Sequence, residues 1–366
     1  MALREDTARQ DFGAKKLYAW EYSFYAEDDI ILGSRLKANI GIHWSSFNVR
    51  GEFYSVLQPR VSVRYLITSQ LSAKSSYSRM AQYIHLLTNS SVGMPTDLWV
   101  PTTDLLRPQK SDQIAVGFAQ NFRENYEISL EGYYKTMGNL LEYKEGAAFF
   151  DIDDAWERKI LQGSGQSYGV ELFAQKKTGS LTGWLGYTLS WTDRQFDALN
   201  DGRRFPYKYD RRHDVSIALM KRFGRKIELS GAWVFGTGNC VTPPVGIYDV
   251  GHPVSSEAMR PPPEQAYLLW KPSPYTVYDY GERNGYRMRA YHRLDLSISF
   301  IKEKKWGERR WVIGVFNAYN RKNPFYLDVE RKYIFNERTG EDFTQYKYVQ
   351  YSLFPIIPSI SYNFKF

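Results

Sequence analysis

The sequence predicts an all-β protein, an antiparallel up-and-down transmembrane β-barrel that is incomplete, with about 13 strands. Three observations predict this class. Apolar residues recur at every second position in segment after segment, which places them on one face of a strand. The connections are alternately short and long, as in membrane barrels with tight turns on one side and longer loops on the other. No run of 18 apolar residues occurs, so the sequence contains no candidate transmembrane helix.

The amino-acid composition is consistent with the wall of a membrane β-barrel. Aromatic residues make up 16% of the chain, with 29 Tyr and 10 Trp, and the mean hydropathy is −0.50. A polar average is expected because lipid-facing and lumen-facing residues alternate along barrel strands. The net charge of +8 comes from Lys and Arg scattered among 40 acidic residues, without the clustered basic patch typical of nucleic-acid binding. Cys240 is the single cysteine, which excludes an internal disulfide.

Thirteen segments carry the strand pattern, with turn or loop residues between them. In chain order they are residues 16–27, 32–44, 59–68, 71–80, 112–122, 126–143, 167–176, 183–192, 211–221, 226–235, 292–300, 311–325 and 355–366. A short acidic turn at Asp28-Asp29 is expected to end the first segment. Segment 71–80 has the weakest pattern, but without it the alternation of short and long connections would break.

The second segment shows the two faces most clearly. Leu36, Ile40 and Trp44 lie on its apolar face, whereas Arg35 and Lys37 lie between them. Cations on that second face could not be buried in a dry core without partners, so this face is expected to line an aqueous lumen. Later segments show the same division. The charges predicted to face the lumen are Arg35, Lys37, Arg64, Glu131, Glu171, Asp214, Arg293 and Asp295.

The alternation of connections also gives the chain a direction. If the tight turns are periplasmic, the first strand descends and the last strand brings Phe366 to the periplasm. A single-chain bacterial barrel has an even number of strands and both ends in the periplasm. An odd set that begins with a descending strand therefore predicts further strands upstream. Residues 1–6 lack the apolar region of a signal peptide, which agrees with that expectation.

Four stretches resemble TonB-dependent receptors, in the form common in Bacteroidetes. Tyr209–Ile217 resembles a stretch that opens a late barrel strand, and Val315–Asn320 resembles the Asn-Leu-Phe-(Asp/Asn) segment of the penultimate strand. Ser352–Phe366 resembles the closing strand, and Gln82–Pro101 resembles an outer loop. The resemblance covers essentially the whole chain.

The resemblance implies a 22-stranded barrel around a plug domain, with this chain supplying the C-terminal strands and lacking the signal peptide, TonB box, plug and early strands. It implies a non-enzymatic part of an outer-membrane importer of a siderophore, haem, cobalamin or glycan in a Gram-negative cell, with no cofactor. The implied partners are membrane lipid, the barrel-assembly machinery, the plug and early strands, TonB through the plug, and the small-molecule or glycan ligand. The closing residues Ile360, Tyr362, Phe364 and Phe366 resemble the signal recognised by that machinery, although lipid facing alone explains the same pattern.

The sequence predicts neither catalytic residues nor a metal site. The five His are dispersed, and neither a Gly-x-Ser-x-Gly elbow nor a P-loop occurs. Asp151, Asp153 and Asp154 could bind Ca²⁺, but a solvated acidic loop is the favoured interpretation of these residues. Aromatic and cationic residues outside the strand centres are the candidates for ligand contact. They are Trp99, Trp156, Tyr248, Trp270, Tyr275, Arg211 and Arg212.

Purely structural roles also explain these candidate residues. A cross-strand ion-pair ladder explains Arg211, Arg212 and Asp214, and an interfacial girdle explains aromatics such as Trp44, Trp191 and Tyr362. Two other classes of protein stay open. A complete passive channel would need a closed barrel with an even number of strands. A soluble all-β binding or hydrolytic protein would need a second sheet packed on the apolar faces.

Overall fold

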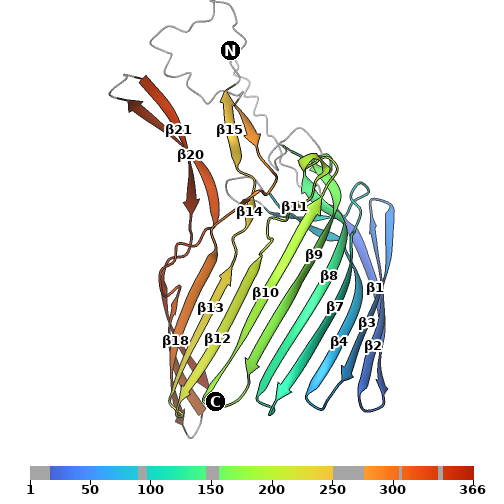
Figure 1. Ribbon diagram of the computed structural model, residues 1–366, viewed down its shortest axis with the longest axis vertical. Helices are drawn as coiled ribbons and strands as arrows, with labels where there is room; N and C mark the ends of the chain where they lie inside the picture. The colour runs from blue at the N-terminus through green and yellow to red at the C-terminus, as the bar shows by residue number, and fades with distance from the viewer. Residues whose placement is uncertain (1–16, 90–96, 146–155, 250–275, 305–306, 337–340) are drawn as a thin grey trace, which may run out of the picture.

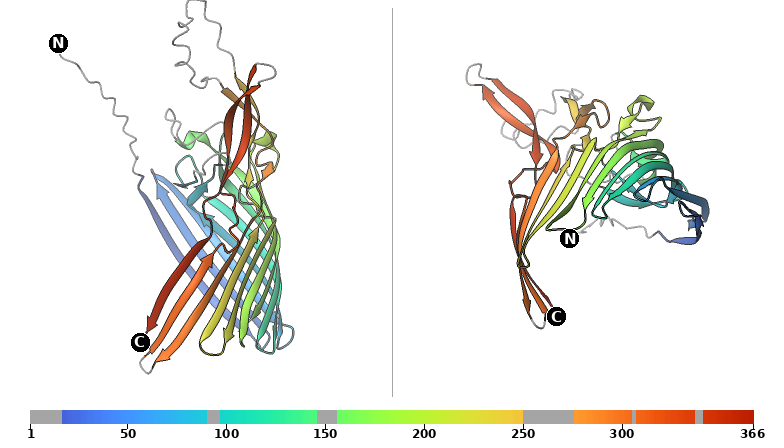
Figure 2. Two further views of the ribbon diagram at one scale, coloured as in Figure 1. Left: turned by 90° about the vertical axis from the view of Figure 1, so that its left-hand side faces the viewer. Right: turned by 60° about the horizontal axis from the view of Figure 1, so that its bottom comes forward.

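The computed structural model describes residues 17–89, 97–145, 156–249, 276–304, 307–336 and 341–366. One large antiparallel sheet dominates the molecule and curves into an open, C-shaped wall (Figures 1 and 2). The sheet has 14 strands, of which β11 pairs only with the end of β10, and the others follow one continuous path. None of the described segments forms a helix long and apolar enough to cross a membrane.

The strands of this path alternate in direction from β1 to β22. They are β1 (Ala19–Leu32), β2 (Leu36–Val49), β3 (Glu52–Leu66), β4 (Leu71–Gln82), β7 (Gln109–Phe122), β8 (Tyr126–Tyr143), β9 (Ile160–Lys176), β10 (Leu181–Gln195), β12 (His213–Phe223), β13 (Ile227–Gly236), β18 (Tyr291–Lys304), β19 (Gly307–Phe316) and β22 (Ile357–Lys365). The prediction of an all-β antiparallel sheet with about 13 strands is confirmed.

The long connections contain small elements of their own. They are β5 (Ile84–Leu87) paired with β6 (Leu98–Pro101), β11 (Phe205–Pro206), β14 (Cys240–Val241) paired with β17 (Tyr286–Arg287), β15 (Pro244–Asp249) paired with β16 (Thr276–Tyr280), β20 (Tyr326–Asn336) paired with β21 (Glu341–Tyr351), and the 3₁₀ turns η1 (Trp156–Lys159) and η2 (Asn200–Gly202). All of them lie beyond the upper end of the wall in Figure 1, which we call the loop end.

Two predicted boundaries at the start of the chain are wrong. The first strand continues through Asp28 and Asp29, because Asp29 accepts a hydrogen bond from the side chain of Asn39 on β2 (2.9 Å). The turn comes later, at residues 33–35, where Gly33 adopts a φ of +68° that favours glycine. Arg35 therefore lies in this turn and not on a strand face.

The connection between β2 and β3 also differs from the expected long loop. Both strands continue past Trp44 and Pro59 and meet at a two-residue turn, Arg50-Gly51, with φ values of 50° and 86°. Such a turn has the positive φ values that suit a tight β-hairpin. Residues 45–58, which were expected to form a long loop, instead extend β2 and β3 into a longer hairpin. The other connections keep the predicted alternation of short and long.

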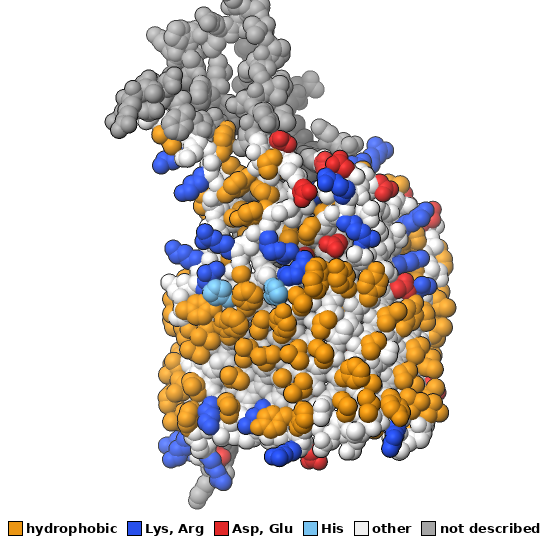
Figure 3. Space-filling model, in the orientation of Figure 1, with side chains coloured by type: hydrophobic (Ala, Val, Ile, Leu, Met, Phe, Trp, Pro, Cys, Tyr) orange, Lys and Arg blue, Asp and Glu red, His pale blue; other side chains and the backbone are white. Residues whose placement is uncertain are grey.

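The convex face of the wall carries an uncovered apolar band (Figure 3). Ile114 on β7, Leu219 on β12 and Ile313 on β19 are 54%, 51% and 47% exposed. No second sheet packs against this band in the described part of the chain, and the buried apolar clusters lie at the loop end. A soluble sandwich would bury such a face, because exposed apolar patches of this extent are costly in water.

Candidate functional site

Apart from Arg35, which lies in a turn, the charges that were predicted to face the lumen lie on one face of the sheet. Residues directly opposite one another in antiparallel strands share a face. One such row runs from Lys37 on β2 to Asp214 on β12. Asp214 is opposite Gly236 on β13, and Gly236 is opposite Tyr291 on β18. Arg293 and Asp295 follow Tyr291 at every second position, so they lie on the same face. In order, the row contains Lys37, Arg64, Lys74, Gly117, Glu131, Glu171, Thr188 and Asp214. The row is cationic on β2–β4 and anionic from β8 onward, and we call its face the inner face.

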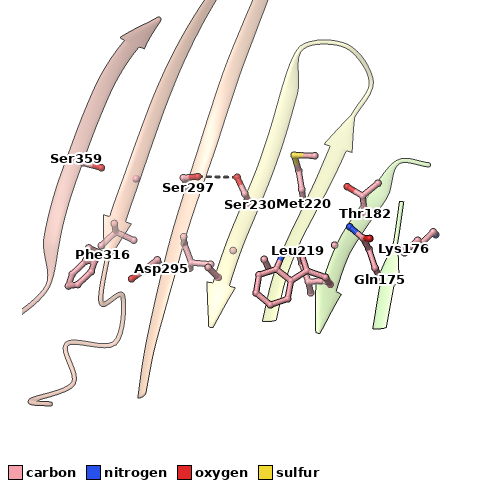
Figure 4. Close-up of a pocket in the computed structure, with 18 of the residues that line it drawn as sticks. Gln175, Lys176, Thr182, Leu219, Met220, Ser230, Asp295, Ser297, Phe316 and Ser359 are labelled. Atoms are coloured by element: carbon pink, nitrogen blue, oxygen red, sulfur yellow. Dashed lines mark hydrogen bonds between the residues drawn. The ribbon is translucent and has the colours of Figure 1, made fainter. Parts of the chain in front are cut away.

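The inner face is hollowed across its C-terminal strands (Figure 4). An open cavity of about 640 Å³ extends from β9 to β22. Its floor includes a row of small residues, Ser230, Ser297, Gly314 and Ser359, each directly opposite the next. The hydroxyls of Ser230 and Ser297 lie 3.1 Å apart, and a Cβ on Gly314 would lie 2.8 Å from Ser359 Oγ. Small side chains on the inner face leave room for another polypeptide surface against the wall.

The loop end is capped by a folded layer built from β5, β6, β11, β14, β17, η1 and η2, which we call the loop platform. Two buried apolar clusters hold it. The first contains Leu87, Val100, Leu106, Leu141, Tyr143 and Ile160, and the second contains Leu140, Phe196, Leu199 and Phe205. Both draw residues from β8 and from distant connections, so the platform is continuous with the wall.

Glu142 is a charged hub of the platform. Its side chain is 1% exposed, and its two carboxylate oxygens accept hydrogen bonds from Arg194 Nη1 (2.8 Å) and Arg283 Nη2 (3.0 Å). Arg194 also donates to the carbonyl of Leu141 (3.1 Å), and its guanidinium lies 3.8 Å from the ring centroid of Tyr207. One carboxylate thereby links the end of β8 to the end of β10 and to the connection between β16 and β17.

Asp210 is a second hub and explains part of the predicted arginine cluster. Its buried carboxylate accepts hydrogen bonds from Arg287 on β17, from Arg212 (3.4 Å) and from the backbone N–H of Thr192 (2.8 Å). Arg212 also lies over the ring of Trp191, 4.5 Å from its centroid. These contacts give Arg212 a structural role, and its Nη1 is buried without a hydrogen-bond partner in the part of the chain that the structure describes.

Arg211 lies apart from Arg212. Its Nη1 donates to Asp214 Oδ2 (3.1 Å), three residues along the chain, and its side chain crosses Gly236 on the inner face. Arg211 and Arg212 therefore pair with acidic residues close to them in the sequence, and among the residues that the structure describes no cross-strand ladder forms between them and an adjacent wall strand. A distant partner, Arg287 on β17, pairs with Asp210.

A third link joins the connection after β4 to the one before β12. Lys208 Nζ donates to Asp97 Oδ1 (2.8 Å), and the Tyr209 hydroxyl donates to Asp97 Oδ2. Burial alone would raise the pKa of Asp97, but the hydrogen bonds from Lys208 and Tyr209 outweigh it and lower that pKa. Nearby, burial lowers the pKa of His85 to about 4, so its imidazole is neutral at pH 7.

The aromatic candidates for ligand contact do not converge on one site. Trp99 on β6 is 66% exposed and points into solvent, whereas Trp156 packs against the first buried cluster of the platform. Trp156 therefore has a packing role. The side chain of Tyr248, and the whole of Trp270 and Tyr275, lie outside the described residues. Asp151, Asp153 and Asp154 lie outside them as well, and the described residues contain no cluster of His, Cys, Asp or Glu that could hold a metal ion.

Aromatic side chains border the apolar band on the side of the loop end. Trp191 stacks on Tyr168 (5.4 Å between centroids), and the Tyr187 hydroxyl lies 3.0 Å from His213 Nδ1. His292 Nδ1 lies 2.8 Å from the Tyr319 hydroxyl. Figure 3 shows His side chains at this border, with Lys and Arg immediately above the band. Such belts of amphipathic rings are typical of membrane–water interfaces.

The closing strand lies with its apolar residues on the same face as the band. Ile360 and Tyr362 are opposite Ile313 and Trp311 on β19, and Phe364 follows on the same face. Phe366 comes directly after β22 and is 92% exposed. The strand thus presents three apolar side chains toward the turn end of the wall, and the exposed Phe366 ring packs edge-on against Phe364 (4.4 Å between centroids).

Sequence reasoning missed the carboxylate hubs of the platform. Glu142 and Arg283 are 141 residues apart, and Asp97 and Lys208 are 111 residues apart. No local pattern marks such partners, because each is an ordinary charged residue in a loop or at a strand end. Only the dense charge cluster from Arg211 to Asp214 gave a signal, and it was assigned to a cross-strand ion-pair ladder.

Solved structures with a similar fold include outer-membrane iron receptors. The FrpB iron transporter from Neisseria meningitidis matches with a TM-score of 0.54 and 13% identity over 96% of this chain and 46% of that chain. The ferric yersiniabactin uptake receptor FyuA from Yersinia pestis matches with a TM-score of 0.56 and 12% identity, over 95% of this chain and 46% of that chain. The ferric preacinetobactin receptor BauA from Acinetobacter baumannii matches with a TM-score of 0.57 and 10% identity, over 95% of this chain and 43% of that chain. At these identities the likeness shows the fold alone, and the chain spans less than half the length of these receptors.

No curated protein matches the chain. A protein family does match, over residues 6–320, and its description is "TonB dependent receptor-like, beta-barrel". The match runs from the start of the wall through β19, and it agrees with the two-faced antiparallel sheet and the folded loop end. The chain belongs to the TonB-dependent receptor-like β-barrel family.

Proposed function

We propose that this chain is the C-terminal part of the wall of an outer-membrane importer in a Gram-negative cell, and that the importer takes up a scarce nutrient. The observation that carries the proposal is the two-faced sheet, with an uncovered apolar band on its convex face and a charged, hollowed inner face. Membrane barrels need this division because one face meets lipid and the other an aqueous lumen. The family membership supports the assignment to TonB-dependent import.

The wall is completed by strands beyond this sheet. No described strand pairs with the outer edge of β1 or of β22. Unpaired backbone groups in lipid cost several kcal/mol each, so an open sheet does not span a membrane stably. Because every pairing on the path is antiparallel, β1 and β22 run in the same direction. Antiparallel closure therefore needs an odd number of additional strands, and a seam between two copies of this sheet would be parallel.

The hollow of the inner face is where we place the plug domain of the complete receptor. The small residues of its floor let a packed surface approach the backbone of β13, β18, β19 and β22 (Figure 4). The plug also supplies the contact with TonB, and the wall itself carries no catalytic role. The closing strand, with Phe366 at its end, serves as the signal for the barrel-assembly machinery. The motif resemblance favours a receptor of the Bacteroidetes type.

The nutrient is best sought among ferric chelates. The three matched structures are named for iron or ferric-siderophore uptake, and these names give the first class to test, ahead of haem, cobalamin and glycans. The loop platform, held rigid by buried ion pairs, provides the surface over which such a ligand would enter.

A neighbouring pair of substitutions tests the role of the inner face. Ser297→Trp fills the hollow, whereas Leu296→Trp places the same side chain on the convex face. Overpacking an interface costs about 1–3 kcal/mol, so uptake of a ferric chelate should fall by about tenfold or more for Ser297→Trp. Leu296→Trp should transport normally, since Trp is tolerated on a lipid-facing surface.

The measurement is energy-dependent uptake of radiolabelled iron as a ferric chelate by cells that produce the receptor containing this wall, with a protonophore as the blank. Equal uptake by both variants would contradict the placement of the plug in the hollow. Uptake that does not depend on the receptor at all would contradict the proposed function.

A further inference from the structure

A second cavity lies at the loop end, outside the inner face. It has a volume of about 570 Å³ and lies between β21, the residues following β17 and the connection after β19. Its described lining includes four cations, Arg289, Arg321, Lys322 and Lys347, and no carboxylate. Apart from Gln350, the remaining lining is aromatic or apolar, and Tyr286, Met288, Leu327 and Tyr348 contribute to it. A volume of this size suits a small ligand.

The four cations differ from the arginines of the loop platform. Arg194, Arg283 and Arg287 are each paired with a buried carboxylate. Among the described residues, no ion pair involves any of the four cavity cations, and this is what separates them from the platform arginines. The Nε of Arg321, like that of Arg283 in the platform, is buried without a hydrogen-bond partner within the described ranges. The carboxylate nearest by register is Glu330, opposite Lys347 in the hairpin, and it accepts a hydrogen bond from Tyr351 (2.9 Å). Unpaired cations that converge on one cavity favour an anionic ligand.

The floor of this cavity is fixed by buried amides. Asn317, which is fully buried, accepts a hydrogen bond from the backbone N–H of Arg321 (2.9 Å) and donates to its carbonyl (2.9 Å). Asn323 exchanges two hydrogen bonds with the backbone of His292 (3.0 and 2.9 Å). The Arg321 side chain donates to the carbonyl of Ala290 (3.2 Å). The segment carrying Arg321 and Lys322 is therefore held in place before any ligand binds, which lowers the entropic cost of binding.

The cavity adjoins the aromatic border of the apolar band, where we place the membrane boundary. His292, clasped by Asn323, belongs to the aromatic border of the apolar band and contacts Tyr319. Lys and Arg side chains gather on the convex side just above the band, over the upper ends of β13 and β18 (Figure 3). Arg binds phosphate through paired N–H groups and Lys binds it as a point charge. We propose that this cavity binds a multiply charged, phosphate-bearing anion, and its position at the boundary favours the headgroup of an anionic lipid over a soluble phosphate compound.

Lipid and soluble probes separate these sources. The receptor containing this wall is measured in phosphatidylcholine bilayers with and without phosphatidic acid, by native mass spectrometry of bound lipid, and separately with inorganic pyrophosphate in phosphatidylcholine alone. Lys322→Gln with Lys347→Gln, two exposed side chains, should weaken phosphatidic acid binding by about tenfold or more. Lys302→Gln with Lys304→Gln, at the far end of β18, is the matched control and should leave binding unchanged.

Arg321→Gln gives an independent variant, and the heat-modifiable gel mobility of each variant confirms that its barrel is folded. Binding of phosphatidic acid alone, weakened by the cavity variants, supports a lipid headgroup. Binding of pyrophosphate with the same dependence supports the anion site with a soluble source. If the cavity variants bind both probes as the unsubstituted protein does, or if neither probe binds, the proposal is overturned. Because iron uptake is not the readout, failure here leaves the proposed import function intact. The lipid source alone rests on the proposed membrane placement.

Discussion

Glu142→Gln is expected to open the loop platform while leaving the wall folded. The substitution keeps the shape of the side chain but removes the charge that Arg194 and Arg283 share. Breaking a buried ion pair by removing one partner costs about 3–5 kcal/mol, because the remaining charges are buried and uncompensated. Here two guanidinium groups lose their partner, so we expect the free-energy cost to lie in the upper part of that range.

Hydrogen exchange followed by mass spectrometry measures this change. Peptides covering η2, β11 and β17 should exchange on the order of 1,000-fold faster in Glu142→Gln, whereas peptides from β12 and β13 should not change. Glu282→Gln is the matched control. Its carboxylate is 72% exposed and lies 3.7 Å from Arg203, and exposed pairs of this kind contribute about 0–1 kcal/mol. Unchanged exchange in the Glu142→Gln platform would show that the hub does not hold the loops.

Leu130→Arg is expected to prevent stable insertion of the wall. Leu130 lies on the apolar face of β8, opposite Phe118 and Leu172, and is 49% exposed on the convex side. It lies about midway along β8 between the turn that follows β7 and Tyr134, whose ring centroid is 6.3 Å from that of Tyr168 in the aromatic border. An Arg at the midplane of a barrel's lipid face costs about 2–4 kcal/mol.

The neighbouring residue supplies the control for this effect. Glu131→Arg introduces the same side chain one position along β8, on the inner face and opposite Glu171. It removes a like-charge pair and keeps the new charge in an aqueous environment, so the free energy of unfolding should change little. Urea unfolding in lipid vesicles, followed by heat-modifiable gel mobility, gives the free energy of unfolding of each variant. Equal destabilisation by the two substitutions would mean that β8 does not separate lipid from water.

The sequence was sufficient for the strands because alternation is a local property of each segment. The apolar positions of β18, such as Leu294, Leu296 and Ile298, lie on one face as their spacing predicts. The same rule failed at Arg35, because Leu32, Ser34 and Leu36 continue the alternation through a turn that Gly33 creates. Period two marks the faces of a strand but not its end.

The candidate site was less accessible to prediction than the wall. Trp156 and Arg212 looked available as loop or rim residues, yet one packs in a cluster with β8 and the other pairs with Asp210 over Trp191. Their neighbours are far apart in sequence, so their burial depends on how the connections fold together. The four cations of the cavity beside β21 were missed for the same reason, since Arg289 and Lys347 come from connections separated by two wall strands.

The central claim is that the convex face of this wall meets lipid and the inner face meets water. Spin labels on single cysteines at positions 293–298 of β18 test it directly, in a Cys240→Ser background and in lipid bilayers. The account predicts that labels at Leu294, Leu296 and Ile298 are relaxed by oxygen and protected from an aqueous nickel chelate. Labels at Arg293, Asp295 and Ser297 should show the opposite. Equal access of the nickel chelate to both sets, or no alternation with position, would contradict a membrane wall.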